Sequence, residues 1–346
     1  MDIVIFGISG DLARKKLIPA LTSLLNKGEL PSDTRIIGFS RSVKEIDIDP
    51  SFSYARVVGT YDSPASYQEL KERLRPERSQ LFYIALPPSA YRDVLTGLYV
   101  SGIVTKDDAE GQRTILVEKP FGQGLSDAEE LLSLTKEYFR PDQCLKVDHY
   151  AGKEELRKSE MPDISLIKEI VCEIKETATV EGRSGFYDTV GALRDVGQNH
   201  LLFMLATLFK GQGKREEVLE HLMLNNEEML SVGHYEGYEA IETSFSVPLI
   251  LNTNEARNIL IRLRAGKALD ENKASIHISF KDNSNKMIIL SSGTGAYENI
   301  LLDAIKGKYE SFLSPREIVA SWRLIEDVEA KKKSLSMETY PIGGSL

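Results

Sequence analysis

Over the first 150 residues, short apolar runs alternate with segments of helical periodicity. Each apolar run ends at glycine, proline or a charged residue, which is the pattern of short buried strands. Strands that are apolar throughout are covered on both faces, and helices between them indicate parallel βαβ units. We therefore predict a Rossmann-like, doubly wound parallel sheet in residues 1–150, with strands at Ile3–Phe6, Arg35–Phe39, Leu81–Leu86, Thr114–Val117 and Leu145–Val147.

Two helices of this half carry start signals. Leucines recur at helical spacing between residues 17 and 25, and Pro19 suits the first turn of a helix. Ser126 and Glu129 have the spacing of a capping box in front of another apolar stripe. The second helix is therefore expected to begin at Ser126.

After residue 150, strand patterns follow one another without long helices between them. Ile170, Cys172 and Ile174 alternate with charged neighbours, as in a strand with one exposed face. Helices are expected near 193–209 and from Tyr297 to about Ala330. The pattern predicts that residues 151–346 form a β+α domain on a large antiparallel sheet, with strands at Ala240–Val247, Ile259–Leu263, Ser275–Phe280 and Met287–Leu290.

Composition narrows the function classes. The 346 residues include 43 Lys and Arg against 52 Asp and Glu, a net charge of −9, which argues against a binder of nucleic acid or of an anionic membrane. The longest largely apolar stretch, Leu201–Phe209, is far shorter than the ~18 residues of a membrane span. The first residues lack the cationic start of a signal peptide. Two cysteines lack metal-ligand spacing, so no metal site is predicted, and a cytoplasmic enzyme or binding protein is expected.

The first predicted strand runs into a glycine-containing turn over residues 7–12. Gly7 and Gly10 would let backbone N–H groups approach a ligand closely, although their spacing is not that of the six-position dinucleotide motif. Arg14, Lys15 and Lys16 crowd the start of the following helix, where the helix dipole disfavours cations unless an anion is near. The segment predicts a pyrophosphate site; the alternative is an ordinary turn with a solvated basic face.

The end of the second predicted strand bears on the type of dinucleotide. NAD sites place a carboxylate there to hold the ribose hydroxyls, whereas this chain has Arg41. A guanidinium matches a 2′-phosphate, so NADP is favoured. In the alternative, Arg41 is a surface residue and Asp47 or Asp49 is the relevant acid.

Two further segments place reactive side chains at strand ends, the edge where ligands sit in open α/β sheets. Lys119 follows a buried strand and precedes Pro120, a candidate for a cis peptide bond. The segment from Lys146 to Lys153 offers several hydrogen-bond donors that together suit a phosphate. The alternative for the lysines is a solvated loop position.

Asp195 and His200 lie in the helix predicted over 193–209. At ~100° per residue an α-helix turns their side chains ~140° apart, so they are not expected to pair. If His200 is a general base, Asp148 at a strand end is the better candidate for its carboxylate, and such an imidazole takes up a proton near pH 7. The alternative is a histidine that serves packing alone.

The order of these segments resembles that in glucose-6-phosphate dehydrogenases. The Asp148–Glu154 segment, Asp-His-Tyr-x-Gly-Lys-Glu, is the most specific part of the resemblance. The resemblance extends over nearly the whole chain, through Gly7–Leu12, Glu118–Gly122, Glu181–Arg183, Arg194–His200, Arg264–Leu269, Leu301–Ala304, Trp322 and Tyr340–Gly343.

The resemblance implies oxidation of glucose 6-phosphate to a 1,5-lactone, the first step of the oxidative pentose phosphate pathway. His200 would remove the proton of the C1 hydroxyl, with Asp148 as its partner, while hydride passes to the nicotinamide C4. The residues implied to hold the 6-phosphate are His149, Tyr150 and Lys153, and those implied to bind sugar hydroxyls or phosphate are Glu176, Asp195 and Lys267.

The implied cofactor is NADP, with NAD as the alternative. Lys119 would touch both sugar and cofactor, and Arg41 would lie at the 2′-phosphate. The second domain of this family commonly mediates dimerisation, which implies a homodimer. The other residues implied at the dinucleotide are Gly7, Ser9, Gly10, Asp11, Leu12 and Tyr91.

The chain also departs from the family pattern. It is shorter than the usual member, and Thr177–Val180 stands where the family often has Pro-Phe-Gly. The second basic residue after Lys267 falls at Asn272 or Lys273, depending on the alignment. These changes leave two alternatives: a dehydrogenase of a different hexose phosphate, and a non-catalytic paralogue that binds sugar phosphate or dinucleotide.

Overall fold

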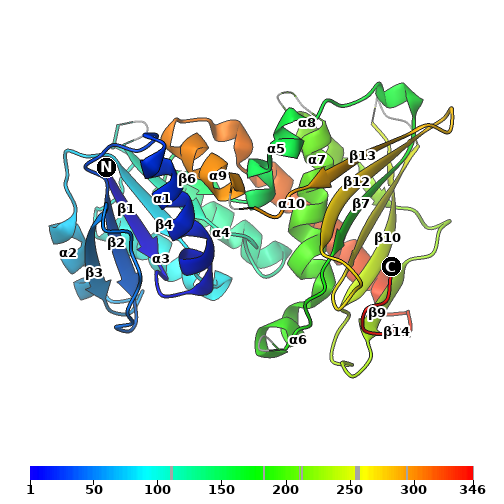
Figure 1. Ribbon diagram of the computed structural model, residues 1–346, viewed down its shortest axis with the longest axis horizontal. Coiled ribbons are helices and arrows are strands. Elements are labelled where there is room, and N and C mark those ends of the chain that lie inside the picture. Colours follow the sequence, from blue (N-terminus) through cyan, green and yellow to red (C-terminus); the bar gives the residue numbers. More distant parts are fainter. Residues whose placement is uncertain are drawn as a thin grey trace. The chain divides into compact units, whose positions relative to one another are not determined.

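The computed structural model describes residues 1–109, 112–181, 184–209, 211, 213–253, 258–293 and 295–345, with the backbone alone at 184–186 (Figure 1). Gly182 and Arg183 of the family motif therefore lie outside the described residues. The chain divides into two compact units, Met1–Gly152 with Gly293–Leu313, and Lys153–Ser292 with Ser314–Leu346. The boundary expected at residue 150 placed residues 293–313 in the second domain, whereas in the structure they belong to the first compact unit.

The first unit is built on a six-stranded parallel sheet in the order β3-β2-β1-β4-β5-β6. This is the doubly wound order predicted from the apolar runs, and it reverses direction between β1 and β4. β1 and β4 are buried along their whole length. The strands are β1 (Asp2–Phe6), β2 (Arg35–Ser40), β3 (Ser53–Val58), β4 (Gln80–Ile84), β5 (Arg113–Val117) and β6 (Cys144–Lys146).

Helices α1, α2, α3 and α4 each connect two strands of this sheet. Pro19 lies in the first turn of α1, as predicted, and the π-helical segment η1 precedes this helix. α4 begins at Leu125 with Gly124 as its N-cap, so Ser126 lies inside the helix and the predicted capping box is wrong. The helical segments are η1 (Ala13–Leu17), α1 (Ile18–Asn26), α2 (Pro64–Arg73), η2 (Pro88–Ala90), α3 (Tyr91–Val100), α4 (Leu125–Tyr138), η3 (His149–Gly152), α9 (Gly295–Ile305) and η6 (Tyr309–Ser311).

Helix α9 comes from late in the chain but packs against the first unit. It contacts α1 and the η3 turn, and ion pairs join it to the end of α1: Lys27 with Glu298 at 2.5 Å, and Lys306 with Glu29 at 2.7 Å. Its apolar positions Tyr297, Ile300 and Leu301 are buried, because packing an apolar helical stripe removes it from water. This helix packs against the η3 turn and so lies beside one of the predicted ligand segments.

The second unit holds an eight-stranded sheet in the order β13-β12-β7-β11-β10-β9-β14, with β8 paired to β10. Most pairs are antiparallel, as predicted, but β11 pairs with β7 and β14 pairs with β9 in parallel. The sheet is therefore mixed. Its strands are β7 (Ile167–Lys175), β8 (Leu222–Leu224), β9 (Ser231–Tyr235), β10 (Ser244–Leu251), β11 (Ile259–Gly266), β12 (Lys273–Phe280), β13 (Asn285–Leu290) and β14 (Glu338–Tyr340).

Helices cover one face of this sheet (Figure 1). Along β11, buried Ile259, Ile261 and Leu263 alternate with half-buried residues, because successive side chains of a strand point to opposite faces. The longest helix starts at a complete capping box between Ser314 and Glu317. The helical segments are α5 (Glu154–Lys158), η4 (Ile164–Leu166), α6 (Ser184–Ala192), η5 (Leu193–Leu201), α7 (Leu202–Leu208), α8 (Lys214–Glu220) and α10 (Pro315–Lys332).

Candidate active site

The glycine turn after β1 lies at the point where the strand order reverses. Gly7 has φ of 80°, and a Cβ atom there would lie 2.4 Å from the carbonyl oxygen of Ala85, just past β4. The Gly10 N–H donates to the Gly7 carbonyl at 2.8 Å and closes the turn. A side chain at Gly7 would clash with the Ala85 carbonyl, so only glycine lets this turn pack against the end of β4.

The other residues predicted along the dinucleotide follow this turn. Ser9 and Leu12 are half-buried and Asp11 is exposed. Lys15 donates to the Asp11 carboxylate at 2.8 Å, so an acid already lies beside the basic residues at the start of the helical segment. A groove of about 1170 Å³ opens here, between this segment and the loop that carries Asp47 and Asp49.

Arg41 is the first residue after β2 and is exposed. The two acids considered as alternatives lie farther along the loop. Asp49 accepts the Ser51 N–H at 2.9 Å, so its carboxylate stabilises a local turn. The strand boundary predicted from the sequence, one residue before Ser40, agrees with the structure closely enough to leave Arg41 at the strand end.

The segment after β5 combines Lys119 with a deeply buried carboxyl. Burial raises the pKa of Glu118 to about 7, against the effect of the Tyr83 hydroxyl that donates to it. Lys119 donates its N–H to the same carboxyl at 3.2 Å, and the Lys119–Pro120 bond is cis, as the sequence suggested. Tyr91, predicted near the cofactor, is fully buried and donates its hydroxyl to the Glu118 carbonyl at 2.8 Å. This hydrogen bond from Tyr91 stabilises the turn at Glu118 and Lys119.

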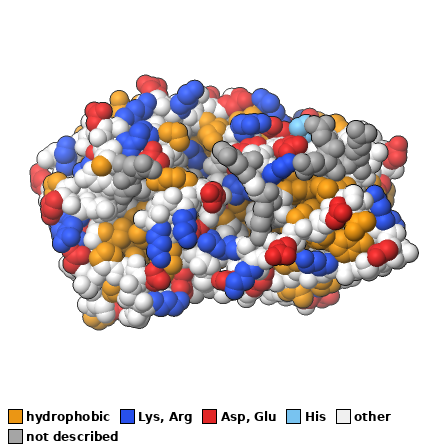
Figure 2. Space-filling model, turned by 90° about the horizontal axis from the view of Figure 1, so that it is seen from above, with side chains coloured by type: hydrophobic (Ala, Val, Ile, Leu, Met, Phe, Trp, Pro, Cys, Tyr) orange, Lys and Arg blue, Asp and Glu red, His pale blue; other side chains and the backbone are white. Residues whose placement is uncertain are grey.

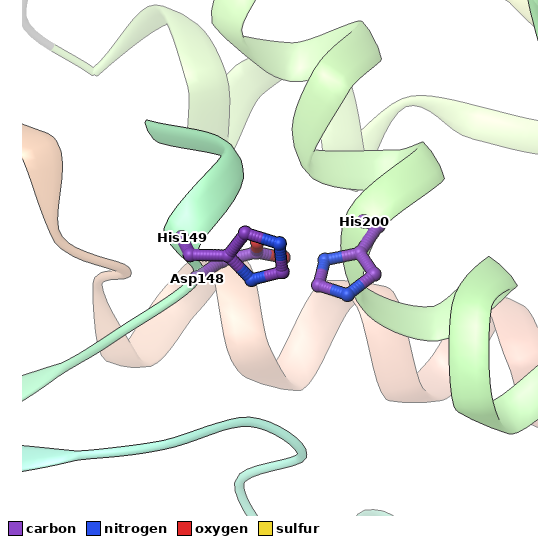
Figure 3. Close-up of side chains that lie close together, drawn as sticks. All are labelled: Asp148, His149 and His200. Carbon is purple, nitrogen blue, oxygen red and sulfur yellow. The ribbon is translucent and has the colours of Figure 1, made fainter. Parts of the chain in front are cut away.

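The segment after β6 brings three of the predicted residues together. The side chains of Asp148 and His149 lie close together here (Figure 3). Asp148 is fully buried and accepts the Tyr150 N–H at 2.9 Å, which closes the turn that starts η3. The His149 ring stacks on Tyr297 of α9, with ring centroids 5.1 Å apart and planes 10° from parallel. α9 therefore helps to fix the direction of the His149 imidazole, a contact that the sequence pattern did not predict.

Lys153, the third residue of the predicted phosphate cluster, is the first residue of the second unit. It lies at the start of α5, is 8% exposed, and donates its ammonium group to the carbonyl of Ser291. The hydrogen bond holds the side chain of Lys153 against the end of the β13 segment. Its position is thus set by the second sheet.

His200 lies on the η5 segment, which is π-helical rather than α-helical (Figure 3). Hydrogen bonds in a π-helix run from residue i to i+5, so residues five apart stand one turn above each other on the same side. The α-helical angle used to separate Asp195 from His200 therefore does not apply to this segment. His200 is 6% exposed, and π-helical turns of this kind recur at functional sites.

Glu176 and Lys267 form an ion pair at 2.6 Å, next to Asp195 at 4.0 Å from the same ammonium. The parallel pairing of β7 with β11 explains this geometry, because Lys175 pairs with Gly266 and the next residue of each strand leaves the sheet side by side. The ammonium also lies 5.2 Å from the ring centre of Tyr187. Three residues predicted to bind the sugar thus lie together in the second unit.

Charged side chains of both signs are interspersed on the face shown in Figure 2. This mixture of signs fits the composition of the chain, with 43 Lys and Arg against 52 Asp and Glu. Among the described helices, none is both long enough and apolar enough to cross a membrane.

Comparison with known proteins identifies a family. The model of the glucose-6-phosphate dehydrogenase NAD binding domain matches residues 4–49 and 49–157, and the model of the C-terminal domain matches residues 160–215. Glucose-6-phosphate 1-dehydrogenase of Schizosaccharomyces pombe is 31% identical over 366 residues, covering 86% of this chain and 71% of the relative. A solved glucose-6-phosphate dehydrogenase in complex with glucose 6-phosphate has a TM-score of 0.82 and 25% identity, with 100% of this chain and 95% of that chain covered.

The relatives are longer than this chain. The enzyme of Cyberlindnera jadinii is 28% identical over 460 aligned positions, covering 99% of this chain and 92% of the relative. That alignment exceeds the 346 residues present here, so the relative carries segments that this chain lacks.

Proposed function

The chain belongs to the glucose-6-phosphate dehydrogenase family, and we propose that it oxidises glucose 6-phosphate at C1 to 6-phospho-D-glucono-1,5-lactone with NADP as hydride acceptor. The observation that carries the proposal is the segment Asp148-His149-Tyr150 at the carboxyl end of β6 in a member of this family. The same edge of the sheet presents Gly7 and Lys119, at the ends of β1 and β5.

The dinucleotide is proposed to lie over the turn at Gly7. The proposal is supported by the position of this glycine turn, which has Gly7 at positive φ and lies where the strand order of the sheet reverses, the point at which such sheets bind dinucleotides. Arg41 would hold the 2′-phosphate of NADP as a bidentate donor, and NAD remains the alternative acceptor. The pyrophosphate and ribose would be lined by Ser9, Gly10, Asp11 and Leu12. Tyr91 would contribute indirectly, by stabilising the Glu118–Lys119 turn through its hydrogen bond to the Glu118 carbonyl.

His200 is proposed as the base. The nicotinamide ring of the bound dinucleotide would accept the hydride that leaves C1. As the C1–H bond breaks, neutral His200 takes the proton of the C1 hydroxyl, so the C–O bond becomes the carbonyl of the lactone. Asp148 would accept the other ring N–H of His200 and stabilise the imidazolium that forms.

The remaining side chains would bind the substrate. His149, Tyr150 and Lys153 would donate to the 6-phosphate, because charge-assisted donors suit a dianion. Glu176, Asp195 and Lys267 would hold sugar hydroxyls, with the carboxylates accepting and the ammonium donating. Lys119 would contact both sugar and dinucleotide and so fix their mutual orientation.

The test is absorbance at 340 nm with glucose 6-phosphate, run in parallel with NADP and NAD. We expect reduction of NADP, and a loss of kcat by at least a hundredfold in the matched variant His200→Asn, since a positioned base contributes about 10²–10⁴-fold. Reduction of NAD alone would keep the reaction but contradict the role of Arg41. Turnover that His200→Asn leaves unchanged would overturn the assigned base.

A second candidate is a dehydrogenase of another hexose phosphate. The two departures from the family pattern meet in the structure: Thr177 donates its N–H to the Asn272 side chain at 2.9 Å, and Asn272 donates back to the Thr177 hydroxyl at 2.7 Å. This pair lies next in sequence to Glu176. A panel of hexose phosphates decides between the candidates, and clear preference for glucose 6-phosphate rules out the second.

We also propose that the protein is a homodimer through its second sheet and that it acts in the cytoplasm. The location is proposed by analogy with two relatives from Arabidopsis thaliana that are named as cytoplasmic. The edge strand β13 exposes Met287 and Ile289 by 52% and 58%. Exposed apolar side chains at adjacent same-face positions are typical of a protein–protein surface.

A further inference from the structure

Tyr187 on α6 carries a buried hydroxyl group without a hydrogen-bond partner among the described residues. The side chain is 3% exposed. Nearly all buried polar groups in proteins are paired, so an unpaired one calls for a physical explanation. Phenylalanine would fill almost the same volume without the cost of removing a hydroxyl from water.

The surroundings of this hydroxyl belong to the proposed sugar site. The Lys267 ammonium lies 5.2 Å from the centre of the Tyr187 ring. The charges that act most strongly on the hydroxyl are those of Asp195, Glu242 and Glu176, in that order. Each of the two glutamates already accepts from a lysine, Glu176 from Lys267 at 2.6 Å and Glu242 from Lys332 at 3.1 Å.

The hydroxyl keeps its proton at every working pH. Burial raises the pKa of Tyr187 well above its usual value, and the three carboxylates add to the effect. The group is therefore a hydrogen-bond donor, and what it lacks is an acceptor. A neutral sugar hydroxyl oxygen suits it, because such an oxygen can accept from the tyrosine while donating its own proton to a neighbouring carboxylate.

We propose that Tyr187 determines specificity in the sugar site by donating a hydrogen bond to one hydroxyl oxygen of the hexose phosphate. The inference rests on the proposed function, since Asp195, Glu176 and Lys267 are the side chains assigned to that sugar. It adds a recognition contact that the sequence motifs did not predict. Because the hydroxyl has no partner among the residues that the structure describes, the group proposed to bind the sugar contributes nothing favourable to folding.

The variant Tyr187→Phe separates these two effects. Its melting temperature is expected to equal or exceed that of the parent protein, because no folded-state hydrogen bond is lost. Its KM for glucose 6-phosphate is expected to rise about tenfold, the effect of one hydrogen bond. A merely structural role would instead lower the melting temperature and leave KM unchanged.

Tyr238→Phe is the matched control. Its ring contacts that of Tyr187, with centroids 6.4 Å apart, but its hydroxyl donates to the Asp188 carboxylate. This control should lose some stability and keep the parent KM. An equal rise of KM in both variants would overturn the assignment to the Tyr187 hydroxyl.

A set of 2-, 3- and 4-deoxyglucose 6-phosphates identifies the acceptor. The analogue that lacks the contacted hydroxyl should serve the parent protein and Tyr187→Phe with equal kcat/KM, whereas the others should retain the tenfold difference. A difference that persists with every analogue, or that is absent with glucose 6-phosphate itself, would overturn the inference.

Failure of the proposed function gives a different result. The parent protein would then reduce neither dinucleotide with any hexose phosphate. Thermal shift with glucose 6-phosphate alone still tests Tyr187, because a bound ligand raises the melting temperature. A smaller shift for Tyr187→Phe than for Tyr238→Phe supports the inference without turnover. Equal shifts, or no shift for the parent protein, overturn it.

Discussion

Glu118 is a carboxyl group whose protonation couples folding to pH. Its pKa is raised to about 7 by burial, while its partners Tyr83 and Lys119 favour the ionised form. Between about pH 4.5 and 7 the folded protein holds a proton that the unfolded chain has released. Raising the pH through this window therefore removes stability, in total about 3 kcal/mol for a shift of this size.

The variant Glu118→Gln tests this coupling. Glutamine keeps an acceptor for the Tyr83 hydroxyl and does not titrate. The difference in free energy of unfolding between the parent protein and Glu118→Gln should fall by about 3 kcal/mol from pH 4.5 to 7 and stay constant above. Urea unfolding at four pH values measures it. Parallel curves for the two proteins would contradict the raised pKa of Glu118.

At the residue scale, the sequence predicted those site residues that are neighbours in the chain. Asp148, His149 and Tyr150 are consecutive, so their position at one strand end follows from predicting the strand. Tyr187 and Tyr297 were missed, because each meets its partner only through folding: Tyr297 reaches His149 across roughly 150 residues of chain. No local signal separates such a tyrosine from one that serves packing alone.

At the scale of elements, Gly152 links the η3 turn to α9. A Cβ atom at this position would lie 1.9 Å from the carbonyl oxygen of Ala296, and Asn299 donates to the Gly152 carbonyl at 2.8 Å. No alanine fits without moving α9. Gly152→Ala should lower the free energy of unfolding by about 1–3 kcal/mol, the cost of overpacking.

The same change should also affect substrate binding, because α9 carries Tyr297 against the His149 ring. Denaturant unfolding and the KM for glucose 6-phosphate measure the two effects. Gly293→Ala is the control, since a Cβ atom there has open space around it, and it should stay within about 0.5 kcal/mol of the parent protein. If Gly152→Ala behaves like this control, the close packing of η3 and α9 is wrong.

Three of the strands that the sequence did not predict lack a readable pattern. β3 has exposed and half-buried positions along most of its length, so it lacks the apolar run that marked its neighbours. β8 and β14 have three residues each, too few for a period to show. The π-helical geometry of η5 cannot be read from an apolar stripe, because the stripe around residues 193–209 fits an α-helix as well. Pairing of β7 with β11 depends on contacts between distant segments.

At the scale of the whole molecule, the second sheet offers the surface proposed for dimerisation. Met287 and Ile289 alternate along the edge strand β13 and so point to the same face. Removal of such side chains from water favours association by about 25 cal/mol per Å² of apolar surface. Two exposed apolar residues on an edge strand would otherwise promote aggregation. A partner subunit that covers them would explain why they are exposed in the single chain.

The double variant Met287→Glu/Ile289→Glu tests this surface. In a dimer of this variant, the two new carboxylates of each copy would be buried against the two carboxylates of its partner. The desolvation and repulsion of these charges would cost more free energy than the interface provides. Light scattering on a sizing column should give twice the chain mass for the parent protein and the chain mass for the variant. The control Val100→Glu changes an equally apolar residue, 74% exposed on α3 of the first unit, and should remain dimeric. A monomeric parent protein would contradict the proposed dimer, and a dimer that survives the double variant would place the interface elsewhere. Turnover of the monomeric variant at the parent rate would show that each copy carries a complete site.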